Sequence, residues 1–205
     1  LQLQLALYLN AAIELEQKRF QGKKVKPAGI FYYQIKDPML NREDLKDEEH
    51  PEGELLKKLK MDGIAGAEPE ILEKLDRNLA AGKSVESVAI PVKYTAKGTF
   101  SSNSKVAYEN QFETMRNYVN YKAKEIGQKI LNGNAEVNPF EKQRENACAY
   151  CPYASVCGFD EKIPGYSYRR LHGYTPHEVW EKMKEDLKGG AEHGRFVDPG
   201  TEEGH

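Results

Sequence analysis

Apolar side chains recur at three- and four-residue steps in two long stretches, a spacing that lines one face of an α-helix. The first stretch is followed by basic residues up to Arg19 and by Gly22, which is typical of a helix C-terminus. Its apolar positions are Leu1, Leu5, Tyr8, Ala12 and Leu15. The second stretch runs from Tyr108 to Ile130. The pattern predicts one helix at the start of the chain and a longer one in its second half.

Two shorter helices are each predicted to begin at a proline, which suits a first helical position because it needs no N–H there. One begins at Pro51, carries three leucines and ends near Gly63. The other follows Pro69 and turns apolar side chains inward as far as Leu79. The charged segment 41–50 before them is predicted to be a loop.

A last helix is marked by Thr175-Pro-His-Glu178, which has the form of a capping box. In this motif the two polar side chains satisfy each other's backbone N–H groups. We expect the helix to end at Gly189-Gly190. Residues 189–205 are polar and without periodicity, so they are predicted to form a disordered tail.

Two segments have the composition of strands. Gly29–Ile35 is apolar and aromatic on both faces, which predicts a strand buried on both sides. Val88–Tyr94 alternates apolar residues on one face, and its internal Pro91 restricts it to an edge or a bulge. Lys97-Gly98 is predicted to be a turn. Strands mixed with helices indicate an α/β protein.

The composition is that of a globular chain with one main domain. Of the 205 residues, 39% are hydrophobic and 30% are charged, and no apolar run is long enough to cross a bilayer. The formal net charge of −2 gives no overall attraction to nucleic acid, so any DNA contact must be local.

All three cysteines, Cys148, Cys151 and Cys157, lie in one short window. A C-x2-C pair lets two sulfurs approach one metal from a tight turn, and a third cysteine five residues further on can join them. An iron-sulfur cluster or an all-thiolate zinc site needs four ligands, so one is missing. We expect it, together with an N-terminal portion of a larger protein, to lie outside this sequence.

Other interpretations of the cysteines remain open. Buried free thiols behave as small hydrophobic side chains, but such residues have no reason to cluster. A disulfide would leave one cysteine over and would need an oxidising compartment. His172 or His177 could complete a zinc site with three cysteines, although the capping-box helix explains His177 without a metal.

Two basic segments could hold phosphates. Lys93, Lys97 and Lys105 stand among several hydroxyl side chains in a segment without acidic residues, and Arg169 and Arg170 follow the cysteine window. Solvated surface side chains are the alternative interpretation.

Four segments together resemble the C-terminal nuclease domain of AddB, a component of bacterial AddAB helicase-nucleases. They are Leu1–Tyr8, Ile35-Lys-Asp-Pro38, Lys97-Gly-Thr-Phe-Ser101 and the cysteine window through Asp160. The resemblance extends from Leu1 to about Leu187. It implies a PD-(D/E)XK (RecB-like) nuclease fold, a mixed central sheet flanked by helices, here incomplete and with a C-terminal iron-sulfur segment.

The resemblance also implies how the chain is divided. Residues 1–145 would be the distal part of the nuclease core, with a helical insertion near 41–80. Residues 146–188 would be the iron-sulfur segment and the C-terminal helix. Such an insertion argues against the small stand-alone nucleases of the superfamily, such as CRISPR adaptation exonucleases.

Gln4 and Tyr8 fall on the Q-x-x-x-Y motif that the resemblance implies. The helix that carries this motif packs beside the active centre of the family. Because the two residues are four apart, their side chains share one helix face, where glutamine could orient a phosphate, a metal-bound water or the catalytic lysine. Spacing alone would favour ordinary helix packing.

The resemblance implies a [4Fe-4S] cluster held by one cysteine N-terminal to the nuclease core and by three spaced like Cys148, Cys151 and Cys157. Such a cluster fastens two distant parts of the chain together. The family's catalytic carboxylates, which hold Mg²⁺, and its lysine would lie upstream of Leu1. We therefore expect this chain alone to be inactive, and Asp37 to belong to a turn.

The implied function is Mg²⁺-dependent 5′-3′ DNA exonuclease activity within a helicase-nuclease that processes double-strand breaks for recombinational repair. The implied partners are DNA and an AddA-type subunit, the implied location is the bacterial cytoplasm, and no membrane is involved. The alternative is a non-catalytic DNA-binding module stapled by a cluster or by zinc.

Overall fold

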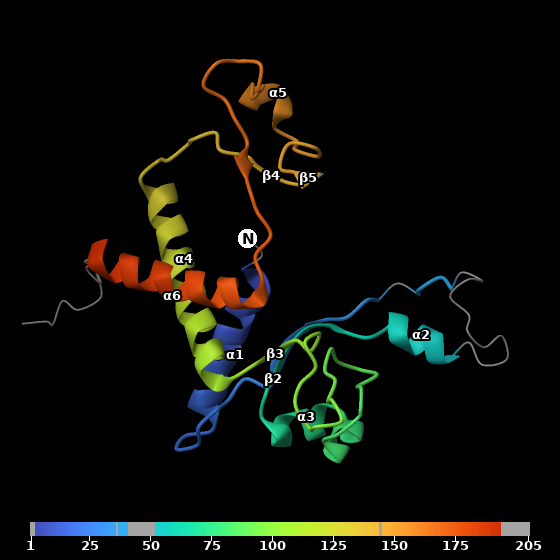
Figure 1. Cartoon of the computed structure of the whole chain (residues 1–205). Coiled ribbons are helices and arrows are strands. Elements are labelled where there is room, and N and C mark those ends of the chain that lie inside the picture. The colour runs from blue at the N-terminus through green and yellow to red at the C-terminus, as the bar shows by residue number, and fades with distance from the viewer. Residues whose placement is uncertain (1–2, 36, 41–51, 144, 194–205) are drawn as a thin grey trace, which may run out of the picture. The chain divides into compact units, whose positions relative to one another are not determined.

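The computed structural model describes residues 3–35, 37–40, 52–143 and 145–193. It divides into two compact units, one up to Val119 and one from Asn120 onward (Figure 1). The predicted loop 41–50 and Pro51 lie outside the described residues. No helix in the described part of the chain is long and apolar enough to cross a membrane.

Helix α1 (Gln4–Arg19) confirms the predicted first helix, but its buried face is not the predicted one. The buried residues are Ala6, Asn10 and Ile13, whereas Tyr8 is 61% and Leu15 is 65% exposed. The true inner face contains a polar residue, which apolar spacing could not identify. Among the predicted apolar positions that the structure describes, Tyr8, Ala12 and Leu15 are exposed and Leu5 is half-buried.

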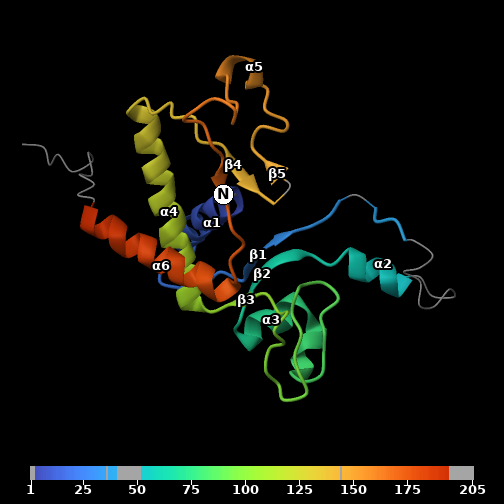
Figure 2. The ribbon, with the colours of Figure 1, turned by 45° about the horizontal axis from the view of Figure 1, so that its top comes forward.

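The first unit contains a mixed three-stranded sheet of β1 (Gly29–Tyr32), β2 (Asp62–Gly66) and β3 (Val106–Ala107). Strand β2 lies in the middle, antiparallel to β1 and parallel to β3 (Figure 2). Strand β1 is shorter than the predicted 29–35 and only half-buried, and Ile35 is 92% exposed. The prediction of burial on both sides was therefore wrong.

Strand β2 begins where the sequence predicted the end of a helix, near Gly63. Helix α2 (Glu52–Lys58) ends before Gly63, and the chain then enters the sheet. Gly63 has a φ of +151°, and a β-carbon there would clash with the carbonyl oxygen of Ile30. Glycine is therefore required for β1 and β2 to approach closely.

The helix predicted after Pro69 is present, but it breaks at Asp76. Helix α3 (Pro69–Leu75) and the 3₁₀ helix η2 (Arg77–Ala81) lie on either side of this residue. The Asp76 carboxylate accepts hydrogen bonds from the Asn78 N–H at 3.0 Å and from the Ser87 hydroxyl at 2.6 Å. Asp76 therefore caps η2 and ties it to the following loop.

Residues 88–94 do not form the predicted strand. The segment bends, and its last two residues make only isolated bridges, Lys93 with Glu86 and Tyr94 with Phe100. The bend follows Ser87, whose hydroxyl accepts hydrogen bonds from two of the next backbone N–H groups. Ile90, Val92 and Tyr94 still reach the core, whereas Val88 is 49% exposed. The buried members of this core are Ala65, Leu72, Leu79, Ile90, Val92 and Tyr94.

Helix α4 (Glu109–Leu131) confirms the predicted long helix, and Phe112, Met115 and Val119 of its first half are buried. The predicted turn at Lys97-Gly98 is also confirmed, since the Gly98 N–H bonds the Thr95 carbonyl at 3.0 Å. Both were predictable because their signals are local.

The second unit holds the end of α4, a small sheet and two further helices. The sheet consists of β4 (Phe140–Lys142), β5 (Glu145–Asn146) and β6 (Arg169–Arg170), in the order β5-β4-β6, and none of its strands was predicted. The helices are α5 (Ala154–Cys157) and α6 (Pro176–His193). Helix α6 continues beyond its predicted end at Gly189-Gly190, where Gly190 lies against the Tyr121 ring. Residues 194–205 lie outside the described residues.

Candidate functional site

Gln4 and Tyr8 are joined on the exposed side of α1. The Gln4 amide nitrogen donates a hydrogen bond to the Tyr8 hydroxyl at 2.8 Å. Their four-residue spacing places the two side chains on one helix face, as predicted. The pair is available to a ligand or to another part of the protein, because both side chains are exposed.

The cysteine window begins where β5 ends. The Asn146 side-chain oxygen accepts a hydrogen bond from the Cys148 N–H at 3.0 Å, and the Cys151 N–H bonds the Cys148 carbonyl at 3.2 Å. These bonds form the tight turn that a C-x2-C pair predicts. Cys157 lies at the end of α5, which Gly158 terminates with a φ of +67°.

The cysteine sulfurs are unpaired but not gathered around one point. All three are free thiols; Cys148 and Cys151 are half-buried and Cys157 is exposed. Within the described residues, no group of three His, Cys, Asp or Glu side chains could hold a metal ion. Cysteine thiols are the donors that iron-sulfur clusters use, so the chemistry of these residues fits such a cluster. His172 and His177 are exposed and do not complete a metal site.

Two aromatic residues that the sequence analysis did not identify, Phe159 and Tyr168, make contacts beside the cysteine window. Phe159 follows Cys157 and packs edge-on against the Tyr168 ring, with centroids 4.8 Å apart. The hydrogen bond between Tyr168 and Cys148 is the main cause that raises the pKa of Tyr168 to about 12. Tyr168 therefore touches residues on both sides of the window. The sequence carried no local signal for this contact, because Tyr168 lies eleven residues beyond the last cysteine.

The basic candidates differ in their surroundings. Lys93 pairs with Glu86 at 3.0 Å, Lys105 pairs with Asp62, and Lys97 is exposed. In the second unit, the Arg170 guanidinium lies 3.4 Å from the carboxylate of Glu141, and Arg169 is exposed. The sequence could not reveal these ion pairs, because Asp62 and Glu141 lie 43 and 29 residues from their basic partners and Glu86 meets Lys93 only across a bend of the chain.

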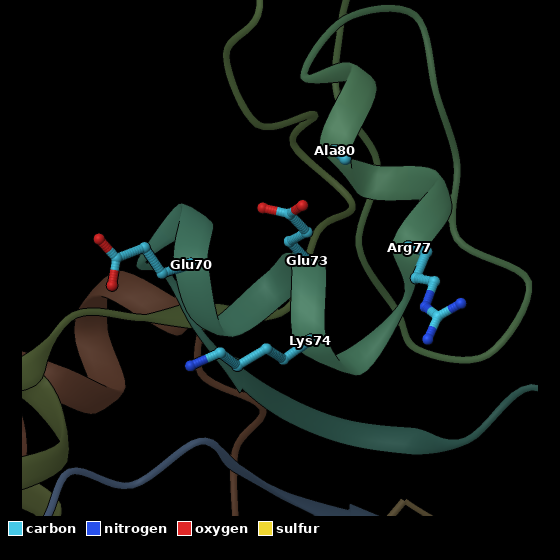
Figure 3. Close-up of a pocket in the computed structure, with 5 residues that line it drawn as sticks. All are labelled: Glu70, Glu73, Lys74, Arg77 and Ala80. Carbon is cyan, nitrogen blue, oxygen red and sulfur yellow. The ribbon is translucent and has the colours of Figure 1, made fainter.

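A groove of about 670 Å³ lies along α3 and η2. Its lining residues are Glu70, Glu73, Lys74, Arg77 and Ala80. Figure 3 shows their charged ends pointing in different directions instead of toward one point. Asp37, the tempting acidic candidate of the sequence, is exposed. Neither place gathers the carboxylates that a catalytic metal requires.

A second, smaller cavity of about 190 Å³ lies between the end of α1, the following loop and α4. At its rim Glu109 binds both Lys24 and Lys26, the latter at 2.8 Å. These bonds lower the pKa of Glu109 to about 2 and raise that of Lys26. These ion pairs connect the loop that carries Lys24 and Lys26 to the first turn of α4.

The sequence profile of the PD-(D/E)XK nuclease superfamily matches residues 1–158. The match therefore covers both helices α1 and α4, the three-stranded sheet and the cysteine window.

Bacterial proteins whose names describe a subunit of an ATP-dependent helicase/deoxyribonuclease are similar over nearly the whole chain. The relative from Lachnoclostridium phytofermentans is 35% identical over 91% of this chain and 16% of its own length. That from Caldanaerobacter subterraneus subsp. tengcongensis is 35% identical over 98% of this chain and 17% of its own length. That from Alkaliphilus metalliredigens is 36% identical over 91% of this chain and 16% of its own length.

The chain thus spans about a sixth of the length of these relatives. Because the superfamily profile matches well over half of its residues, the chain belongs to the PD-(D/E)XK nuclease superfamily.

Proposed function

We propose that this chain is the distal part of the nuclease domain of an AddB-type protein. The activity is Mg²⁺-dependent hydrolysis of the 5′-terminated DNA strand, in a helicase-nuclease that processes double-strand breaks together with an AddA-type partner in the bacterial cytoplasm. One observation carries the proposal, namely the similarity to helicase/deoxyribonuclease subunits along 91% to 98% of the chain.

The catalytic metal belongs to a part of the protein outside this sequence. In the family, the Asp and the Asp-x-Lys residues precede the Q-x-x-x-Y helix, so we assign them to polypeptide upstream of Leu1. Bound Mg²⁺ supplies an activated water and neutralises charge that builds up on the phosphate. The Gln4 amide keeps one N–H for a ligand after donating the other to Tyr8, and Tyr8 holds the amide in place.

The cysteines hold a [4Fe-4S] cluster in this proposal. Cys148, Cys151 and Cys157 supply three thiolates, and a cysteine N-terminal to the nuclease core supplies the fourth. In this proposal the turn at Cys148 and Cys151 would supply two of the donors, and Cys157 would supply the third from the end of α5. The cluster's role is structural, because it joins two segments that are far apart in the sequence.

The test uses the full-length protein, purified without oxygen and assembled with its partner subunit. Duplex DNA labelled at the 5′ or the 3′ end is incubated with the complex in Mg²⁺ or in EDTA, with the partner's own nuclease inactivated. We expect Mg²⁺-dependent loss of the 5′-terminated strand. A complex that binds and unwinds the duplex but leaves this strand intact would instead be a non-catalytic DNA-binding module.

Iron analysis tests the cluster separately. We expect about four irons per chain and a brown colour. Stoichiometric zinc without iron would reject the iron-sulfur assignment and leave the nuclease assignment untouched.

A further inference from the structure

Three lysines of the first unit form ion pairs with two acidic side chains. Lys60 and Lys93 each place the ammonium nitrogen 3.0 Å from a different oxygen of the Glu86 carboxylate. Lys105 pairs with Asp62, two residues after Lys60. We call Lys60, Lys93 and Lys105 the lysine cluster. It has one positive charge more than its two acidic partners can neutralise.

The backbone fixes the positions of the cluster. The Lys93 N–H donates to the Ser104 hydroxyl at 3.0 Å, and this hydroxyl donates to the Lys93 carbonyl at 2.9 Å. The Lys105 N–H bonds the Pro91 carbonyl at 2.8 Å, while its own carbonyl accepts the N–H of Ala65 in β2. The backbones of Lys93 and Lys105 are thus hydrogen-bonded to each other's neighbours and to β2. The fold therefore sets the distance between these two lysine backbones.

The ion pairs of the cluster are easily exchanged. Lys93 and Lys105 are 54% exposed and Lys60 is 22% exposed, while their partners Glu86 and Asp62 are 52% and 69% exposed. Exposed ion pairs add little to stability, so replacing one carboxylate by another anion costs little. The lysines lower the pKa of both Glu86 and Asp62, so the two acids stay ionised and compete with any anion that approaches.

We propose that the lysine cluster binds backbone phosphates of DNA, and that Glu86 and Asp62 occupy the phosphate positions until DNA displaces them. The proposal rests on the proposed nuclease function, because it takes DNA as the anion. It adds Lys60, which lies far from the other two in the sequence. It leaves out Lys97, for which no ion pair is found among the described residues.

If the two acids compete with DNA for the lysines, acidic and lysine variants should affect DNA affinity differently. A phosphate contact loses affinity when its lysine is removed, and each such contact contributes about 0.9 to the slope of log affinity against log salt concentration. A competing carboxylate has the opposite effect, because its removal frees two lysines at once. Lysine and Glu86 variants should therefore change DNA affinity in opposite directions.

The test measures binding of the full-length protein to a fluorescent blunt-ended duplex in EDTA, which prevents cleavage, over a series of NaCl concentrations. The variants are Lys60→Gln, Lys93→Gln, Lys105→Gln and Glu86→Gln, which keep most of each side chain. Lys129→Gln is the matched control, since Lys129 is an exposed lysine paired with Glu125 at 2.8 Å.

We expect each lysine variant of the cluster to lower the salt slope by about one and to weaken binding at low salt. Glu86→Gln should tighten binding, and Lys129→Gln should change neither quantity. Cluster variants that behave like Lys129→Gln, or a Glu86→Gln protein that binds less tightly, would overturn the inference. If these variants still digest DNA in Mg²⁺, only the role of the lysine cluster is rejected and the proposed nuclease function stands. If the unsubstituted protein neither binds nor cuts DNA, the role of the lysine cluster and the nuclease function are both rejected.

Discussion

Asn10 and Arg116 are 106 residues apart and form two hydrogen bonds with each other. The Asn10 side-chain nitrogen donates to the Arg116 carbonyl at 3.2 Å, and the Arg116 Nε donates to the Asn10 side-chain oxygen at 3.0 Å. Asn10 is only 4% exposed. These bonds tie the helix that carries Gln4 and Tyr8 to the buried half of α4.

Asn10→Ala should loosen this connection. It leaves two part-buried groups of Arg116 without these partners, which costs about 1 to 3 kcal/mol. Hydrogen exchange of the full-length protein should therefore become faster in α1 and in the first half of α4. Asn132→Ala, which removes an exposed acceptor bonded to Gln128 at 3.0 Å, is the control and should leave both helices unchanged. Unaltered exchange in Asn10→Ala would show that the pair does not hold α1.

Gly63→Ala should disrupt the pairing of β1 with β2. The added β-carbon would meet the Ile30 carbonyl, and the φ of +151° is unfavourable for alanine. We expect lost exchange protection at both strands. Gly127→Ala lies inside α4 with no atom within 4 Å of the new carbon, so it should stabilise its helix by about 0.5 to 1 kcal/mol. Equal effects of the two substitutions would contradict the observed strand register.

The bonds from Lys24 and Lys26 to Glu109 predict a pH dependence. Because they lower the pKa of Glu109 from 4.5 to about 2, their stabilising effect is complete above pH 4.5 and is lost as the pH falls through 2. Glu109→Gln should speed hydrogen exchange around residues 24–26 at neutral pH, and the difference from the unsubstituted protein should shrink between pH 4.5 and 2. A difference that is constant over this range would rule out the charge as its cause.

Cys151→Ala tests whether a cluster bound by the cysteine window joins two distant segments of the chain. In the full-length protein it should lower the iron content and make the segment from β4 to α6 more sensitive to protease, since the cluster joins distant segments. Val156→Ala is the control, because Val156 is 84% exposed and supplies no ligand. Full protease resistance in Cys151→Ala would count against the structural role.

The sequence predicted the elements whose signals are local. The capping box of α6 forms as expected: the Thr175 N–H donates to the Glu178 carboxylate at 2.7 Å, which lowers the pKa of Glu178. The long helix α4 and the turn at Gly98 were likewise visible in spacing and residue type. Each of these features needs only residues a few positions apart.

Elements that depend on distant partners could not be predicted. Strand β2 contains glycine and alanine without a periodic pattern, and it is a strand because β1 and β3 pair with it on either side. The buried face of α1 includes Asn10, which only its bonds to Arg116 explain. At the candidate site, the cysteines and Gln4 with Tyr8 were identified from motifs, whereas Tyr168 and Lys60 became apparent only from the folded chain.

The most direct test of the account is the rate of 5′-strand cleavage in Mg²⁺ by the full-length complex carrying Gln4→Ala, compared with Gln128→Ala. Both substitutions remove an exposed hydrogen bond from a helical glutamine to a residue four positions later, 2.8 Å for Gln4 and 3.0 Å for Gln128. If α1 borders the nuclease centre, Gln4→Ala should slow cleavage at least tenfold, about 1.4 kcal/mol, with DNA binding retained, and Gln128→Ala should not. Equal cleavage rates in the two variants would contradict that placement.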